Sequence, residues 1–474
     1  MLRYIYLAAI SCYMCSELFP KLQPLNKGAS VLCLAAVLLS LYRARGLALF
    51  FGSFFLVSGS LLLALGGAKP ASYVLSFGEM IQMVTLFALV PILSLPVRYG
   101  NYTEELTAII QNTIRNEKQL YGLTSLIAYF FSSFMNLAAL PMTYYAIEWS
   151  VLQAPIKNKK RFLSQSITHG YAMPLLWSPI TPIVGTVLLL TGTRYSKLLP
   201  LLITLSLAGF FIDWITFSIF RRKKTFAAER AAALQMPQSQ IHEAHPWRLL
   251  HVLLATLLLN ALVTLLDHFV PLSFLLLVSF IVIPFSYIWC LLIRQSRAFF
   301  VGVRDHFRTY PNKMSNQFFI FLSAGFFMTT LHTSRADDQI TSWVSLLIGF
   351  AGFRIFLILL PLIPFSLAFL GLHPAIGLAL IAGALHAELL SRAPLVVTVA
   401  MLGGAIPAFL MGPYNATLGM MGGLIDERPL MLSKWNLPFT AVYLIFLTLF
   451  VQLLYAALPQ GVAASVLGTA SACF

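Results

Sequence analysis

Two stretches of this chain place hydroxyl and amide side chains beside prolines inside otherwise apolar runs. The first is 177–182, Trp-Ser-Pro-Ile-Thr-Pro, and the second is 412–417, Gly-Pro-Tyr-Asn-Ala-Thr. Proline removes a backbone donor and clashes with the preceding helical turn. Hydrocarbon supplies no water for the freed backbone groups, so such interruptions persist where they are buried in protein or line a cavity. We therefore predict two broken helices whose polar groups bind an ion or a small solute.

The chemistry available at each break is that of helix ends. Half-helix N-termini present unpaired amides and partial positive charge, which favour anions, whereas C-termini present carbonyls that favour cations. Ser178 and Thr181 add hydroxyls at the first break, and Pro413, Asn415 and Thr417 belong to the second. Such side chains can also serve only to satisfy a kinked backbone. The occurrence of two similar breaks favours a substrate-binding site.

Two further polar interruptions precede the breaks, in apolar stretches too long for one span. The stretch 120–153 is interrupted around Ser133 and Asn136, and 340–390 is interrupted around His373. We predict that each stretch forms a re-entrant hairpin with its polar tip beside a break. His373 has two interpretations. It is either a helix cap ahead of a proline, or a group that pairs an anionic substrate or carries a coupling proton.

Four ionisable side chains fall inside apolar runs, where charge is costly: Glu148, His169, Asp213 and Arg354. Ion pairs within the protein or positions at the membrane interface explain them more simply than substrate contact. We single out Arg354 as a possible anion-binding or coupling residue, because a guanidinium binds a carboxylate through two parallel hydrogen bonds.

The sequence carries no zinc-like ligand spacing, no phosphate-binding loop and no nucleophile–base pattern. We therefore assign no catalytic residue and no metal-ligating residue, and we predict that the protein is not an enzyme. The only cofactor that we expect is a coupling ion, Na+ or H+. A bound Na+ would lie near Asn136 and Ser178, where carbonyl and side-chain oxygens gather.

The composition predicts an all-α polytopic membrane protein. Of 474 residues, 59% are hydrophobic and only 10% are charged, whereas soluble domains carry about 25% charged residues. The net charge of +15 comes from basic residues in short loops between apolar runs. This pattern is typical of cytoplasmic loops, and no polar basic domain is present to bind nucleic acid. It places the protein in the cytoplasmic membrane with its N-terminus inside and its C-terminus outside.

Apolar runs of about 20 residues, the length of a membrane span, divide the chain into two similar halves. Each half has spans, an amphipathic surface segment (101–119 or 294–316), a hairpin, a broken helix and a closing helix. We predict an inverted repeat of about eleven transmembrane helices with two re-entrant hairpins and two broken helices. The predicted segments are 1–119, 120–220, a cytoplasmic linker at 221–247, 248–339 and 340–474.

The polar tips and breaks resemble motifs of the ion transporter superfamily. Its best-known branch comprises the divalent anion:sodium symporters, to which arsenite and gluconate permeases are related. The stretch 133–141 is similar to that branch's first hairpin tip, which typically reads Ser-Asn-Thr before small residues and a proline. Here Asn136 and Pro141 keep their places, and Leu137 replaces the threonine.

The breaks at 178–182 and 412–417 resemble the two unwound helices of the same superfamily. The stretch 372–374, Leu-His-Pro, resembles the second hairpin tip of some related permeases and lacks Ser-Asn-Thr. The second tip therefore lacks the hydroxyls expected of a sodium site, which leaves coupling to Na+ or to H+ open.

The resemblance implies a homodimer in which 1–119 and 248–339 form a scaffold in the lipid bilayer. It also implies that 120–220 and 340–474 form transport parts that move like an elevator. We expect a secondary active transporter for a small, carboxylate-like anion. The alternatives are a non-enzymatic membrane component such as a lipid flippase, and the permease subunit of a binding-protein-dependent system. An intramembrane enzyme is the least supported.

Overall fold

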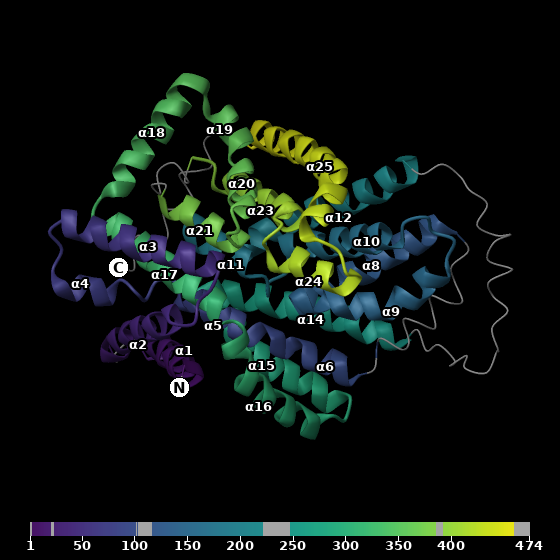
Figure 1. Cartoon of the computed structure of the whole chain (residues 1–474), viewed down its shortest axis with the longest axis horizontal. Coiled ribbons are helices and arrows are strands. Elements are labelled where there is room, and N and C mark those ends of the chain that lie inside the picture. The colour runs from purple at the N-terminus through teal and green to yellow at the C-terminus, as the bar shows by residue number, and fades with distance from the viewer. Residues whose placement is uncertain are drawn as a thin grey trace.

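The computed structural model describes residues 2–19, 23–100, 102, 116–220, 247–384 and 392–458. All regular structure in these ranges is helical (Figure 1). Within them, nine helices are long and apolar enough to cross a membrane, or ten when a pair bent at Gly352 is one span. The prediction of an all-α polytopic membrane protein is confirmed.

The first half of the chain follows the predicted order of elements. Its α-helices and 3-10 helices (η) are α1 (Leu2–Leu18), α2 (Gln23–Leu41), α3 (Leu47–Leu65), α4 (Pro70–Leu75), α5 (Ile81–Leu89), η1 (Val90–Leu93), α6 (Ser94–Tyr99), α8 (Glu117–Met135), η2 (Asn136–Ala138), α9 (Ala139–Gln153), α10 (Lys159–Ala172), η3 (Met173–Leu176), α11 (Pro182–Thr191) and α12 (Tyr195–Phe220). Most of the predicted amphipathic segment at 101–119 lies outside the described residues.

The second half has the same kinds of element. Its helices are α14 (Trp247–Phe269), α15 (Phe274–Leu292), α16 (Ser296–Lys313), α17 (Ser315–Thr333), α18 (Ala336–Ala351), α19 (Phe353–Leu359), α20 (Leu362–Phe369), α21 (Pro374–Ala384), α23 (Pro394–Met411), α24 (Ala416–Ile425) and α25 (Pro429–Ala457). The predicted amphipathic segment at 294–316 corresponds to α16. The predicted linker at 221–247 lies outside the described residues, apart from Trp247, which begins α14.

The first hairpin forms where it was predicted, in α8 and α9. As one straight helix, the 37 residues of Glu117–Gln153 would extend about 55 Å, well beyond the roughly 30 Å of a hydrocarbon core. Instead the chain reverses at Asn136, whose backbone angles are φ 51° and ψ −133°, and the two arms contact each other. L-residues rarely adopt a positive φ, so this tip stores backbone strain.

The second hairpin is shorter than predicted, because the stretch from 340 contains an additional helix. Gly352 takes φ 87°, which glycine adopts without steric cost, and α18 turns away there from α19 and α20 at 118°. The hairpin therefore consists of α19 and α20, a turn at 370–373, and α21. The predicted tip at His373 is correct and the predicted start at 340 is wrong. Residues 385–390 of the predicted hairpin lie outside the described residues.

Both broken helices are present, and each packs against a hairpin arm of its own half. The helix before the first break, α10, contacts α8, and the helix before the second, α23, contacts α20. A Cβ atom on Gly170 of α10 would lie 2.2 Å from the Ser125 carbonyl oxygen. One on Gly404 of α23 would lie 2.5 Å from the Pro361 Cα. In both halves the arm and the broken helix thus approach within backbone contact.

The helices after the breaks cross to the other half. The first, α11, contacts the hairpin arm α21, and the second, α24, contacts the hairpin arm α9. This reciprocal exchange is the contact pattern expected of two inverted repeats around a shared centre. Figure 1 shows the hairpins and broken helices in the middle and upper part of the view, with α1, α2, α15 and α16 along the lower edge.

Candidate functional site

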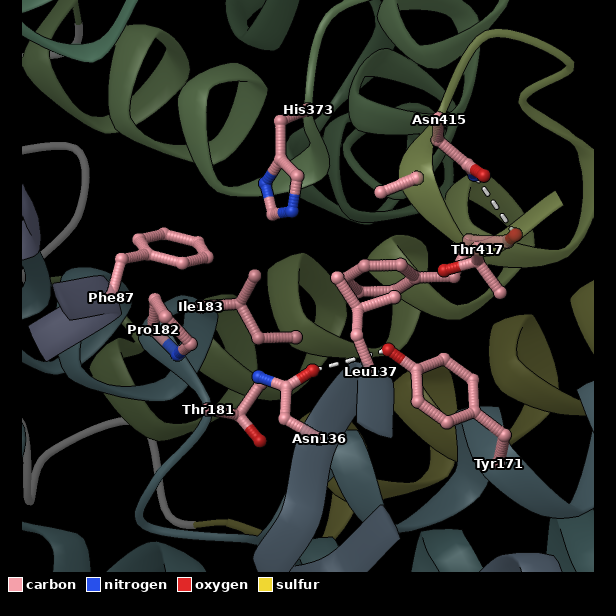
Figure 2. Close-up of a pocket in the computed structure, with 12 residues that line it drawn as sticks. Phe87, Asn136, Leu137, Tyr171, Thr181, Pro182, Ile183, His373, Asn415 and Thr417 are labelled. Carbon is pink, nitrogen blue, oxygen red and sulfur yellow. Dashed lines mark hydrogen bonds between the residues drawn. The ribbon is translucent and has the colours of Figure 1, made fainter. Parts of the chain in front are cut away.

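Both hairpin tips and both breaks meet at one small cavity (Figure 2). Five of the predicted site residues line it, although they come from four separate stretches of the chain. The lining residues are Phe87, Asn136, Leu137, Tyr171, Thr181, Pro182, Ile183, His373, Phe409, Asn415, Ala416 and Thr417.

Most of the lining comes from the first residues of helices. Asn136 and Leu137 begin η2, which leads into α9, and His373 directly precedes α21. The starts of α11 and α24 contribute Pro182, Ile183, Ala416 and Thr417. Four helical segments therefore point their N-terminal ends at the cavity. Helix N-termini carry partial positive charge and unpaired amides, so the cavity is suited to a negatively charged group.

The cavity is almost filled by its own lining in this conformation. The space between the lining side chains is about 10 Å³, roughly what a single ordered water needs. A solute larger than water can enter only if the hairpins or broken helices move apart. The structure therefore represents a collapsed state of the candidate site.

Thr181 contributes a buried hydroxyl whose hydrogen-bonding capacity is unused. Its side chain is 1% exposed, and its Oγ1 has no hydrogen-bond partner among the described residues. A buried hydroxyl without a partner costs roughly 1–3 kcal/mol, and one explanation for such a group is a water or an ion that binds there. Thr181 directly precedes α11, so this hydroxyl adds to the polar groups at that N-terminus.

Tyr171 is a site residue that the sequence analysis missed. Its ring is fully buried, and its hydroxyl donates to Asn136 Oδ1 at 3.2 Å. The contact joins the last turn of α10 to the tip of the first hairpin (Figure 2). No local pattern distinguishes Tyr171 from the other tyrosines, because the contact depends on how α10 packs against α8.

Asn415 lines the cavity while its side chain holds the second break together. Its Oδ1 accepts from the Leu418 amide at 2.8 Å and caps α24. Its Nδ2 donates to the carbonyls of Ala408 and Phe409, both at 2.9 Å. These contacts occupy both hydrogens of the amide. The Asn415 amide therefore satisfies the kinked backbone, which is one of the two roles that the sequence left open. Its neighbour Thr417 also lines the cavity.

His373 adopts the helix-cap arrangement, one of the two interpretations that the sequence left open. Its Nδ1 accepts from the Ala375 amide at 3.2 Å at the start of α21. The imidazole is surrounded by the rings of Phe87, Phe321 and Phe409, with centroids 5.4 to 5.8 Å away. This surrounding is apolar, which disfavours a charged imidazole in the collapsed state.

Ser133, Ser178 and Pro413 support the cavity without lining it. The Ser178 hydroxyl donates to the Ser133 carbonyl at 2.5 Å, and the Ser133 hydroxyl donates to the Phe130 carbonyl at 2.7 Å. These bonds tie the first break to the first hairpin tip. Pro413 is buried in the second break. A sodium ion near Asn136 and Ser178 stays a prediction.

The four ionisable residues predicted at membrane depth have three different surroundings. Glu148 is half-buried and accepts from the Tyr144 hydroxyl at 2.5 Å. Arg354 is exposed, and its carbonyl accepts from Gln452 Nε2 at 2.9 Å, so the structure does not bring its side chain to the cavity. Its position on α19 follows directly after the Gly352 bend, which the sequence analysis did not foresee. His169 and Asp213 instead form a buried contact of 2.6 Å. This agrees with a partner within the protein, and the contact is an ion pair when the histidine is protonated.

Two larger cavities lie elsewhere in the described part of the chain. One, of about 800 Å³, is polar and carries Glu17, Lys27 and Glu79. The other, of about 540 Å³, is bordered by apolar side chains only, from α3, α17, α18, α19, α20, α21 and the turn at 370–373. Neither includes a residue of the two breaks.

Searches with this chain found no matching family model and no matching curated protein. Solved structures with the same fold were found. The YdaH transporter of Alcanivorax borkumensis, described as having an unusual topology, superposes with a TM-score of 0.60 at 12% identity, over 88% of this chain and 100% of that one. MtrF of Neisseria gonorrhoeae, assigned to a class of antimetabolite efflux pumps, gives a TM-score of 0.57 at 12% identity, over 85% and 94%. Such low identity establishes similarity of fold alone.

Proposed function

We propose that this protein is a secondary active transporter that moves a small anionic solute across the cytoplasmic membrane. The observation that carries the proposal is the convergence of four helix N-termini, from two hairpins and two broken helices, on one small cavity. Discontinuous helices that meet between repeats are the usual site of solute binding in secondary transporters. The fold shared with the YdaH transporter and the MtrF pump supports the same conclusion.

The lining chemistry supports an anion as the solute. None of the described residues that line the cavity is acidic, so no carboxylate repels a bound anion. The hydroxyls of Thr181 and Thr417 can donate hydrogen bonds, and the helix N-termini at the cavity contribute partial positive charge. A carboxylate held by such donors needs no arginine, which is consistent with the position of Arg354 away from the cavity.

The division into parts that we propose follows the packing, with the boundary of the second hairpin corrected. The segments 120–220 and 353–458 form the transport part, and the remaining helices form the scaffold of a homodimer with its N-terminus inside. An elevator-like displacement of the transport part carries the cavity between the two sides. The Tyr195 hydroxyl lies 2.9 Å from Asn260 Oδ1, so α12 contacts α14 across this boundary.

A lipid flippase is less well supported. A lipid needs a lateral groove in which a polar headgroup path adjoins an apolar path. The apolar cavity of about 540 Å³ has no charged or hydrogen-bonding side chain among its described lining residues. The cavity at the breaks has both polar and apolar lining residues, and it is too small for a headgroup. The structural features therefore favour a small solute.

Uptake by purified protein in liposomes tests the proposal. Labelled mono-, di- and tricarboxylates and inorganic anions are offered, with Na+ and H+ gradients imposed separately. We expect accumulation of at least one anion above protein-free liposomes, and competition by its structural analogues. If no anion accumulates under either gradient while the protein is folded in the membrane, the proposal is wrong. Adding a soluble binding protein from the same source then tests the permease alternative.

A further inference from the structure

A second polar cluster lies deep in the transport part, separate from the cavity. His169 Nδ1 lies 2.6 Å from Asp213 Oδ1, and the Tyr121 hydroxyl donates to the same carboxylate at 2.9 Å and 3.1 Å. On its other side, His169 Nε2 lies 3.1 Å from Asn436 Oδ1. The side chains of His169 and Asp213 are 2% and 4% exposed. Four helices, α8, α10, α12 and α25, thus contribute one residue each.

The hydrogen bonds of Asn436 determine where the protons of this cluster are. Asn436 Nδ2 lies 2.9 Å from the Leu410 carbonyl oxygen, and only the NH₂ group of an amide can face a carbonyl. Asn436 Oδ1 is therefore the atom that faces His169, so His169 Nε2 must carry a hydrogen. The contact of 2.6 Å between His169 Nδ1 and Asp213 requires one further proton between them. That proton belongs either to an imidazolium or to a carboxylic acid.

The pair therefore holds one removable proton and is neutral overall. Neutrality is expected at this depth, because an uncompensated charge in an apolar interior is costly. Aromatic rings enclose the cluster. Phe439 stacks on His169 with centroids 4.4 Å apart, and Phe217 stacks on Tyr121 at 3.7 Å. The nearest charged residues along the same helices are Glu117 and Lys118 on α8, Arg161 on α10 and Lys434 on α25.

The cluster contacts the segment before the break in both broken helices, near the end of α10 and near the end of α23. His169 lies in the last turn of α10, and two residues later Tyr171 reaches Asn136 in the cavity. Residues two apart on a helix lie about 200° apart around its axis, so α10 presents His169 and Tyr171 on nearly opposite faces. Leu410, whose carbonyl accepts from Asn436, is two residues before Gly412 of the second break. A change in this cluster can therefore move both breaks.

We propose that the His169–Asp213 pair is the proton-binding site through which a proton gradient drives this transporter. The inference rests on the proposed function. When the proton between Nδ1 and Oδ1 leaves, two acceptors face each other at a distance that only a shared proton supports. The pair must then separate or take up water, which displaces α10 relative to α12 and alters the cavity beside Tyr171. Reprotonation restores the collapsed state.

An infrared pH titration of the full-length protein in lipid bilayers tests the site without any solute. Over the pH range in which the protein stays folded, we expect carboxyl and imidazole bands to change together. Asp213→Asn and His169→Gln should each abolish that change. The proposal is overturned if the wild-type bands do not change in this range, or if the change persists in Asp213→Asn.

Two further variants test whether the band change arises from this pair and not from loss of folding or from another histidine. Tyr121→Phe removes only the hydroxyl that donates to Asp213, so the anionic state loses support and the midpoint of the band change should move to higher pH. An unchanged midpoint contradicts the assignment. The matched control is His332→Gln, because His332 and Asp337 also form a contact of 2.7 Å but the histidine side chain is 52% exposed. That variant should retain the titration.

A transport measurement separates this inference from the proposed function. With an anion identified by the uptake screen, Asp213→Asn should lose accumulation driven by a proton gradient and keep exchange of labelled for unlabelled anion at equal concentrations. Loss of both would make the pair a structural element and would overturn the inference. If the screen finds no anion, the proposed function fails by itself, and the infrared titration still decides whether the pair binds a removable proton.

Discussion

The Tyr171 hydroxyl donates to Asn136 Oδ1 at 3.2 Å and so joins the first broken helix to the first hairpin tip. The two residues are contributed by α10 and by the turn between α8 and α9. Asn136 holds a positive φ of 51°, which favours glycine, so the amide side chain is retained at the expense of backbone strain. Strain of this kind gathers at functional sites. The contact is the most direct link between the geometry of the hairpin tip and the cavity.

Replacing Asn136 by glycine separates the effect of the backbone conformation from the effect of the side-chain amide. Asn136→Gly relieves a strained conformation, so we expect thermal stability to stay constant or to rise, by about 1 kcal/mol. Because the amide is lost, anion uptake should fall at least about tenfold, the effect of roughly 1.4 kcal/mol. Thermal unfolding and initial uptake rates in liposomes provide the two measurements. Normal uptake by this variant would remove the Asn136 side chain from the site.

Thr181 allows a test of ligand binding that does not destabilise the empty protein. Thr181→Val replaces a buried hydroxyl without a partner by a methyl group of similar shape, so the stability of the solute-free protein should stay constant or rise by about 1 kcal/mol. Solute affinity should fall, because the bound anion loses a donor. The control is Thr181→Ser, which keeps the hydroxyl. Equal solute affinity in the valine and serine variants would contradict the assignment.

Asn415→Ala should affect folding as well as transport. The side chain caps α24 and satisfies two carbonyls at the end of α23, so its loss should cost about 2 kcal/mol. The expected results are a lower unfolding temperature and loss of uptake by protein that still inserts into membranes. A variant with unchanged stability would show that these hydrogen bonds do not hold the second break.

His373 should act as a helix cap more than as a charged group. Asparagine also caps helices well, so His373→Asn should retain most of the uptake, whereas His373→Ala should lose stability by about 1 kcal/mol. The measurement is uptake as a function of pH in both variants. If His373→Asn abolishes the response to a proton gradient, the imidazole carries the coupling proton and the role assigned to His169 and Asp213 is wrong.

Gly170 and Gly404, where a broken helix touches the backbone of a hairpin arm, should not accept an added methyl group. In Gly170→Ala and Gly404→Ala the new Cβ would meet backbone atoms of Ser125 and Pro361, and overpacking costs about 1–3 kcal/mol. Both variants should unfold at lower temperature. The matched control is Gly423→Ala on α24, whose Cβ would meet no atom within 4 Å and which should raise stability by about 0.5–1 kcal/mol. Equal effects in all three would refute the packing argument.

Interruptions and reversals caused by local chemistry could be predicted from the sequence. Pro179, Pro182 and Pro413 disrupt helical hydrogen bonding wherever they occur, so both breaks were located correctly. The polar tips near Asn136 and His373 were found because apolar stretches around them were too long for one span. The membrane class followed from composition, since a chain with so few charges cannot solvate its surface in water.

Only the tertiary structure decided which of these groups act together. Tyr171 joins the cavity, and His169 meets Asp213 and Asn436, through packing between helices that are distant in sequence. The bend at Gly352 could not be predicted from the apolar run that begins at 340. Hydrophobicity indicates burial or lipid contact, and it carries no information about the direction in which a helix continues. That bend leaves Arg354 on an exposed face. Local propensities therefore determined where the helices break, and long-range packing determined which residues come together at the site.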